Sequence, residues 1–146
     1  MKTDYAQLAL SLALESRSSG QIFRLRVSSG SMRPWLDPGD VVVVTPALAS
    51  ELKPGDIIVV QSAAGLLTHR LISSSSEWLI TKGDACWMVD PPVPPSALFG
   101  RVAASERGGR RIWNFLHPVW RVLQPGVGLF NRVVLAMSVL ARRLRV

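Results

Sequence analysis

The sequence SGSMRPWLDPGDVVVV occupies residues 29–44 and places a serine between two predicted strands. An alternating run ends just before it, and four consecutive valines close it, so both flanks are typical of strands. Gly30 permits a sharp turn before Ser31, and Pro34 stops any helix that begins after it. We therefore expect Ser31 on a tight connection at the rim of a sheet. Most Ser-Gly-Ser turns are only turns, and a serine nucleophile needs a base.

The positive charge lies almost entirely in the C-terminal part of the chain. The formal net charge is +7 over 146 residues, and from Arg101 onward there are nine arginines and one acid. The residues before Arg101 contain eight Lys or Arg against nine Asp or Glu. The aromatic residues of this basic tail are interleaved with Leu and Val, which favours an anionic membrane surface over nucleic acid as its partner.

Cysteine and histidine are scarce, which limits the chemistry that the chain can support. Cys86 is the single cysteine and there are two histidines. This composition excludes an internal disulfide and argues against a structural zinc site. We expect no metal and no cofactor. Cys86 has no base of its own nearby in the sequence and is a poor candidate nucleophile.

The pattern of apolar residues predicts a mainly β domain over residues 1–106 and a helical, basic appendage over residues 107–146. A short N-terminal helix is expected over residues 4–16, with Thr3 or Asp4 as its N-cap. It is too short to span a bilayer and is bracketed by acids, unlike a signal peptide. The expected strands cover residues 22–27, 40–45, 56–61, 66–72, 77–81 and 98–103, and the expected helical segments of the tail cover residues 113–123 and 129–144.

His69 is the candidate base, although a lone histidine in a strand is more often structural. It lies in a predicted strand where Leu67 and Leu71 share its face. The irregular segment 82–90 then supplies two carboxylates, Asp84 and Asp90. A Ser–His pair works when a carboxylate holds the imidazole in the right tautomer, and either aspartate could fold back to do so.

Several short sequence motifs, in their order along the chain, resemble those of the type I signal peptidases. SGSMRP followed by Gly-Asp and a valine run resembles their nucleophile box, and PGDIIV at residues 54–59 resembles the strand that follows it. THR at residues 68–70, TKGD at residues 81–84 and Asp90 resemble the Ser–His branch, the endoplasmic-reticulum, archaeal and sporulating-bacterial type. FGRV at residues 99–102 resembles the closing strand of that branch. The resemblance covers about residues 25–103.

The resemblance implies a signal-peptidase-like catalytic fold and a role for each matching residue. Ser31 would attack the scissile carbonyl, His69 would act as general base and then acid, Asp90 would complete the triad, and Asp84 would be a supporting carboxylate. The backbone N–H of Ser31 and the hydroxyl of Ser29 would hold the oxyanion. The substrate, a signal or leader peptide or pre-protein, would bind as an added β-strand with small residues before the cut.

The identity of the base favours the Ser–His branch. Histidine as a residue type titrates near pH 6.5, whereas a lysine needs deep burial before it can act as a base at neutral pH. The three lysines are Lys2, Lys53 and Lys82, and none occupies the position of His69, where the Ser–Lys branch has its base.

The expected membrane contact departs from the signal-peptidase pattern. Such enzymes carry a transmembrane helix before the serine box, and residues 4–16 are too short for one. The apolar stretch 133–141 is also short and is closed by arginines. We therefore expect peripheral membrane association through residues 112–146, although an ordinary packing helix or a partner-binding surface fits that segment equally well.

Three other interpretations remain open at this level. A self-cleaving repressor has a similar serine box, but it uses a lysine base, a DNA-binding domain and a cleavage site upstream of the serine. A catalytically silent peptide-binding module would keep the fold without turnover. A cytoplasmic peptidase that matures a peptide precursor would need no membrane anchor. Asp40 and Asp56 follow glycines at the starts of strands and are expected to shape turns, while His117 is expected to be structural.

Overall fold

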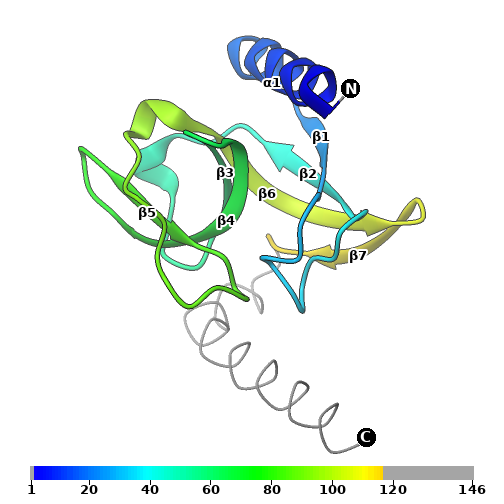
Figure 1. The fold of residues 1–146 in the computed structure, drawn as a ribbon. Coiled ribbons are helices and arrows are strands. Elements are labelled where there is room, and N and C mark those ends of the chain that lie inside the picture. The colour runs from blue at the N-terminus through cyan, green and yellow to red at the C-terminus, as the bar shows by residue number, and fades with distance from the viewer. Residues whose placement is uncertain (1, 117–146) are drawn as a thin grey trace, which may run out of the picture.

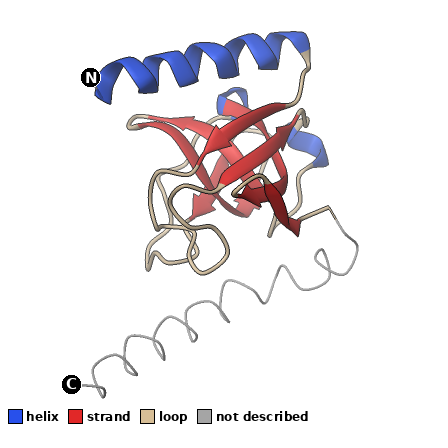
Figure 2. Ribbon diagram, turned by 90° about the vertical axis from the view of Figure 1, so that its right-hand side faces the viewer, coloured by secondary structure: helices blue, strands red, loops and turns tan. Residues whose placement is uncertain are grey.

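The computed structural model describes residues 2–116, without the side chains of residues 2–6 and Ala9. Figure 1 shows a curved sheet with one helix lying across one end, and Figure 2 shows the helix from the side. The elements are α1 (Lys2–Ser19), β1 (Phe23–Arg26), β2 (Val41–Thr45), the 3-10 turn η1 (Ala49–Glu51), β3 (Ile57–Ser62), β4 (Gly65–Ser74), β5 (Leu79–Lys82), the 3-10 turn η2 (Pro95–Ala97), β6 (Leu98–Arg107) and β7 (Arg110–Asn114).

Within residues 2–116 the seven strands belong to one sheet in which every pairing is antiparallel. Their order is β1-β2-β6-β3-β4-β5, and β7 pairs with β6. Strand β6 is long enough to pair with β3 near its start and with both β2 and β7 along its second half. The prediction of a mainly β fold is confirmed.

The sheet is buried on both faces over its central strands. One apolar cluster contains Ile57 and Val59 of β3 together with Met32 and Leu36, while Ile58 and Val60 of the same strand belong to a second cluster. Alternate residues of one strand point to opposite faces, so β3 contributes to both clusters. Strand β2 begins with four consecutive valines, and its three central residues are buried, as in a strand that is covered on both faces.

Two Pro-Gly-Asp turns lead into β2 and β3 with the same geometry. Gly39 and Gly55 have φ angles of 95° and 98°, which suits glycine at the third position of a type II turn after proline. Asp40 and Asp56 each donate their N–H to the carbonyl three residues earlier, at 3.0 Å in both turns. Their carboxylates accept the N–H of that same residue, at 2.8 and 2.9 Å. The prediction that these aspartates shape turns is confirmed.

The N-terminal helix is longer than the predicted span of residues 4–16, and most of its described side chains are exposed. It begins at Lys2, so Thr3 and Asp4 lie inside it and the predicted N-cap is wrong. Leu8, Leu12 and Leu14 are exposed, whereas Ala13 is buried in the first cluster. Leucines at every second position cannot all face one side of a helix, because a helix turns about 100° per residue. Among the described residues, no helix combines the length and apolar character that crossing a bilayer requires.

The start of the predicted helical tail is a strand. Gly108 and Gly109 both have positive φ, at 57° and 76°, and they form a two-residue hairpin turn between Arg107 and Arg110. Strand β7 therefore pairs back onto β6, and the prediction of a helix from Trp113 is wrong for the residues that the structure describes. Phe115 is buried in the first cluster and Trp113 packs against it. The rest of the predicted appendage, including His117 and the segment 129–144, lies outside the described residues.

Candidate active site

Two loops meet at the end of the sheet opposite α1, as Figures 1 and 2 show. The first, which we call the serine loop (residues 27–40), connects β1 to β2. The second, the aspartate loop (residues 83–90), follows β5. The Ala85 N–H donates to the carbonyl of Ser31 at 2.8 Å, so the two loops are joined by a backbone hydrogen bond next to the serine.

His69 of β4 lies between Ser31 and Asp90 and contacts both. Its Nδ1 is 2.6 Å from Asp90 Oδ2, and its Nε2 is 2.9 Å from Ser31 Oγ. An ionised carboxylate only accepts hydrogen bonds, so Nδ1 carries the proton and Nε2 is left to accept from the serine hydroxyl. His69 itself is buried, while Ser31 and Asp90 are partly exposed. The geometry is the one in which an imidazole can take a proton from a serine.

Asp90 is held by Thr81, a residue for which the sequence analysis gave no role. The Thr81 hydroxyl donates to Asp90 Oδ2 at 2.7 Å, and the Asp90 N–H donates to the Thr81 carbonyl at 2.8 Å. Thr81 lies in β5 and is buried, so it fixes the carboxylate from inside the sheet. The sequence signal that could have identified Thr81 is its place at the start of TKGD, residues 81–84.

Ser29, which the resemblance implies as a second oxyanion donor, lies beside Ser31. The two hydroxyl oxygens are 3.2 Å apart, and Ser29 is exposed. Within residues 2–116, the backbone N–H of Ser31 has no hydrogen-bond acceptor. The Ser31 N–H is therefore available to an oxygen bound beside Ser31, and the Ser29 hydroxyl lies close enough to Ser31 Oγ to share its hydrogen bonding.

Asp84 is placed differently from Asp90 and contacts neither Ser31 nor His69. Arg70 donates to both of its carboxylate oxygens, at 2.8 and 2.7 Å, and donates a third bond to the Gly55 carbonyl at 2.8 Å. The side chains of Arg70 and Asp84 are only 3% and 2% exposed. The pair joins the start of the aspartate loop to β4 and to the turn before β3.

Gly83 occupies the most crowded position of the site. A Cβ there would lie 2.7 Å from Cys86 Sγ, 2.8 Å from the Ser31 carbonyl oxygen and 3.0 Å from His69 Nε2. Only glycine allows the backbone to pass this close, and the sequence analysis did not single it out. Cys86 thus lies beside the serine and histidine, and its N–H donates to the Gly83 carbonyl at 3.0 Å.

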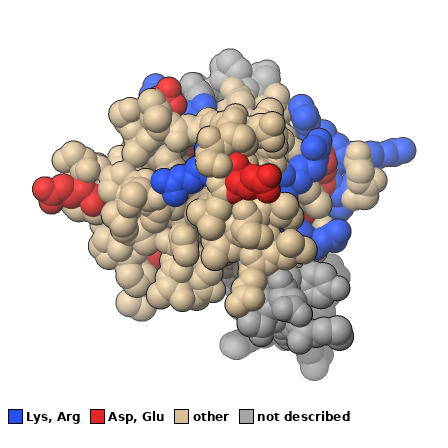
Figure 3. All heavy atoms as spheres, turned by 90° about the horizontal axis from the view of Figure 1, so that it is seen from above, with Lys and Arg blue, Asp and Glu red and all other residues tan. Residues whose placement is uncertain are grey.

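A network of charged side chains joins strand β6 to the serine loop. Arg107 of β6 donates to both carboxylate oxygens of Asp40, at 2.7 and 2.9 Å. These hydrogen bonds hold the pKa of Asp40 below its ordinary value, against the opposing effect of burial, and the same contact raises the pKa of Arg107. Figure 3 shows Lys and Arg side chains gathered toward one side of the molecule, where Figure 1 places the β6–β7 hairpin.

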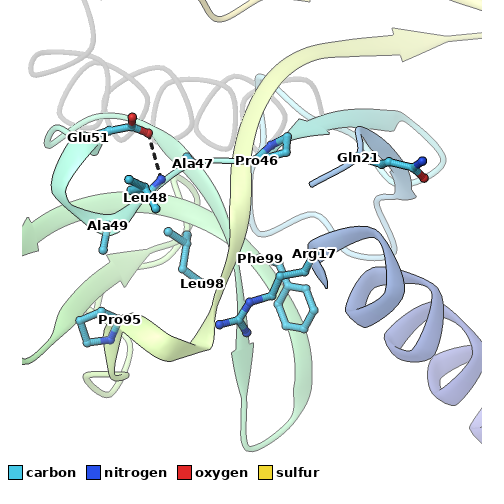
Figure 4. A pocket seen from close by; sticks show the side chains of 10 residues that line it. All are labelled: Arg17, Gln21, Pro46, Ala47, Leu48, Ala49, Glu51, Pro95, Leu98 and Phe99. Carbon is cyan, nitrogen blue, oxygen red and sulfur yellow. Dashed lines mark hydrogen bonds between the residues drawn. The ribbon is translucent and has the colours of Figure 1, made fainter. Parts of the chain in front are cut away.

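A cleft of about 400 Å³ lies near the end of α1, away from these three residues. Figure 4 shows it between the end of α1, the segment that carries η1, and the segment from Pro95 to Phe99. The Arg17 guanidinium lies over the Phe99 ring at 5.6 Å, and the Glu51 carboxylate accepts the Leu48 N–H at 2.9 Å. None of Ser31, His69 and Asp90 lines the cleft. In the part of the chain that the structure describes, no group of three His, Cys, Asp or Glu side chains is arranged to hold a metal ion.

The described residues therefore hold a serine, a histidine and an aspartate in the hydrogen-bonded order that serine peptidases use. The family model described as Peptidase S24-like matches residues 2–82, more than half of the chain. This chain belongs to the Peptidase S24-like family, which indicates a serine peptidase or a protein of related fold. The match includes Ser31 and His69 and ends before the aspartate loop. No curated protein matches the sequence significantly.

Proposed function

We propose that this protein is a serine endopeptidase of the signal peptidase type, of the Ser–His branch. The observation that carries the proposal is the chain of two hydrogen bonds from Ser31 Oγ through His69 to Asp90, at 2.9 and 2.6 Å. Membership of the Peptidase S24-like family supports the peptidase class. The assignment to the Ser–His branch and the proposed class of substrate rest on the order of the sequence motifs around these three residues.

In the proposed mechanism Ser31 Oγ attacks the scissile carbonyl and its proton passes to His69 Nε2. The Asp90 carboxylate accepts the hydrogen bond from His69 Nδ1–H, stays ionised and stabilises the imidazolium that forms. The Ser31 N–H and the Ser29 hydroxyl hold the oxyanion; removing one such donor typically costs about 3–4 kcal/mol of transition-state stabilisation. His69 then gives its proton to the leaving amine, and a water repeats the sequence to release the acyl group from Ser31.

The sheet offers an edge for a substrate strand beside His69. Strand β3 pairs with residues 65–70 of β4 on one side, whereas β5 pairs with β4 only from Arg70 onward. Among the described residues, the other edge of residues 65–69 thus has no strand partner. An extended peptide added there would bring its backbone alongside the base, and we propose that it presents a small residue before the cut.

The proposed substrate is a signal or leader peptide, and we place the protein at a membrane surface, with a cytoplasmic maturation peptidase as the alternative. We narrow the proposed partner surface from the 112–146 expected from the sequence. Residues 112–114 belong to β7, and Phe115 lies in the core. The proposed membrane contact therefore lies in residues 117–146.

An acylating or phosphonylating serine probe tests the catalytic proposal directly. We expect covalent labelling of the wild-type protein at Ser31, no labelling of Ser31→Ala, and a rate for His69→Ala lower by at least ~10³-fold. Mass spectrometry of the digested adduct identifies the labelled residue. Thermal unfolding of the two variants serves as the control for folding. A wild-type protein that never labels would be the silent peptide-binding module and would overturn the peptidase proposal.

A further inference from the structure

The serine loop is closed at its base and anchored inside the first apolar cluster. The Val27 N–H donates to the Asp40 carbonyl, and the Gly39 N–H donates to the Val27 carbonyl, both at 2.8 Å. Met32 and Leu36 are 1% and 0% exposed. These contacts fix the two ends and the inner side of the loop. Its outer side, where Ser31 and Arg33 lie, is held by charged groups.

Arg107 reaches the serine loop from the end of β6. Besides its two bonds to Asp40, its Nη2 lies 2.9 Å from Asp37 Oδ2. Asp40 is 1% exposed and its Oδ2 also accepts the Asp37 N–H at 2.8 Å. One guanidinium therefore joins two carboxylates of the same turn, and one of those carboxylates is buried.

The network continues from Arg107 to the residue before the serine. Asp37 Oδ1 accepts a hydrogen bond from Arg33 Nε at 2.8 Å, so Asp37 joins the two arginines. The side chain of Arg33 lies across Gly30, because a Cβ at Gly30 would be 3.2 Å from Arg33 Nη1. The path from β6 runs through Arg107, Asp37 and Arg33, and it ends next to Ser31.

We propose that Arg107 is a positioning residue that holds Ser31 at hydrogen-bond distance from His69. The proposal rests on the proposed function, since it assigns Ser31 the role of nucleophile. Arg107 lies on a different strand from His69 and touches none of the reacting groups. Arg107 holds the turn at residues 37–40 in place. That turn then fixes the conformation of residues 30–36, which include Ser31.

The physical reason is the buried carboxylate of Asp40. An isolated surface ion pair contributes little, but Arg107 makes three hydrogen bonds to two carboxylates, and Asp40 has no other cation in contact within residues 2–116. Without Arg107, Asp40 must either take up a proton or turn toward water. Turning toward water breaks its bond to the Asp37 N–H and moves the turn that carries Asp37. A displacement of about 1 Å at a nucleophile can reduce the rate about 100-fold.

The test compares Arg107→Gln and Arg107→Lys with Arg110→Gln in the full chain. Arg110 is the cross-strand partner of Arg107 on the same hairpin and contacts no acid among the described residues, so it controls for the loss of one charge. For Arg107→Gln we expect kcat to fall roughly 10- to 100-fold while KM stays within about twofold. We expect Arg107→Lys to recover part of kcat, because lysine keeps the charge but not the two-pronged geometry.

Hydrogen–deuterium exchange supplies a readout that does not depend on activity. We expect the amides of residues 30–36 to exchange faster in Arg107→Gln than in Arg110→Gln, with the core strands unchanged. If kcat and exchange in the two glutamine variants agree within twofold, Arg107 does not position Ser31. If the wild type shows no turnover, the proposed function fails, and the exchange comparison alone decides whether Arg107 holds the loop.

A second variant keeps the test decisive if Arg107→Gln does not fold. Asp37→Asn removes the shared carboxylate of the network and leaves the bonds between Arg107 and Asp40 in place. The Asp37 side chain is 40% exposed, so this change leaves the core intact. We expect a smaller fall in kcat, about 3- to 10-fold, with faster exchange at residues 30–36. Unchanged kcat and unchanged exchange in Asp37→Asn would overturn the proposal.

Discussion

Two aspartates six positions apart have opposite surroundings. Asp90 is partly exposed and accepts hydrogen bonds from a histidine and a threonine. Asp84 is buried and is neutralised by Arg70. Only Asp90 is hydrogen-bonded to His69, whereas Asp84 is bonded on both oxygens to Arg70, so the two residues should respond differently to substitution.

Asp84→Ala should lower stability, and Asp90→Asn should lower activity. Removing Asp84 leaves a buried guanidinium without its partner, which typically costs about 3–5 kcal/mol of unfolding free energy. Losing the carboxylate beside the imidazole of a serine peptidase lowers kcat on the order of 10⁴-fold. Urea unfolding and peptide-cleavage kinetics measure the two effects. An Asp84→Ala protein as stable as the wild type, or an Asp90→Asn protein of full activity, would contradict this division.

At the level of elements, the aspartate loop and strand β6 each make one close backbone approach to a neighbouring segment. The loop is tied to β5 by the Lys82 ammonium, which donates to the Cys86 carbonyl at 2.9 Å, and to the serine loop by the Ala85 N–H. Strand β6 passes close to β2 at Gly100, where a Cβ would be 2.5 Å from the Thr45 carbonyl oxygen. Both approaches require glycine, one at the site and one far from it.

The two glycines form a matched pair for separating site effects from fold effects. Gly83→Ala forces a methyl group against the Ser31 carbonyl oxygen and His69 Nε2, so we expect a kcat loss of about 100-fold or more. Gly100→Ala forces it against the β2 backbone, so we expect a stability loss of about 1–3 kcal/mol. Stability is measured by circular dichroism during heating, and the reactivity of Ser31 is measured by labelling with the serine probe. For each variant, the loss of labelling rate is divided by the loss of stability. If this ratio is the same for Gly83→Ala and Gly100→Ala, Gly83 matters only for folding.

At the scale of the whole molecule, the proposed membrane contact, residues 117–146, follows the last described strand of the β domain along the chain. The described sheet ends with β7, whose Trp113 packs against the core. A truncation that begins at residue 112 would therefore remove a strand and part of the core along with the tail. Substitutions within the tail test membrane binding without disturbing the sheet.

Replacing Arg142, Arg143 and Arg145 by Glu in the full chain should abolish binding to anionic vesicles. Each basic residue near an anionic surface contributes about 1 kcal/mol, so loss of the three alone should weaken binding roughly 100-fold, and repulsion of the added acids adds to this. Flotation with phosphatidylserine vesicles measures binding, and phosphatidylcholine vesicles and the variant Arg24→Glu on β1 are the controls. Equal flotation of the wild type and the tail variant would exclude an electrostatic tail anchor.

The sequence predicted the mainly β fold and most of the strands, because strand periodicity and proline–glycine turns are local signals. The hairpin at Gly108-Gly109 was missed, since this pair was interpreted as the end of a strand and not as the turn into β7. The helical prediction from Trp113 failed because a run of apolar and basic residues fits either a helix or a half-buried edge strand. Pairing with β6 decided between them.

The sequence by itself determined the order of the strands along the chain and the three residue types of the candidate site, Ser31, His69 and one of two aspartates. These follow from neighbours along the chain. Only the tertiary structure decided that Asp90 contacts His69 while Asp84 pairs with Arg70, and that Arg107 reaches the serine loop across 67 positions from Asp40. Such contacts depend on how loops fold back over a sheet, and no local preference of a residue encodes the distance between two loops.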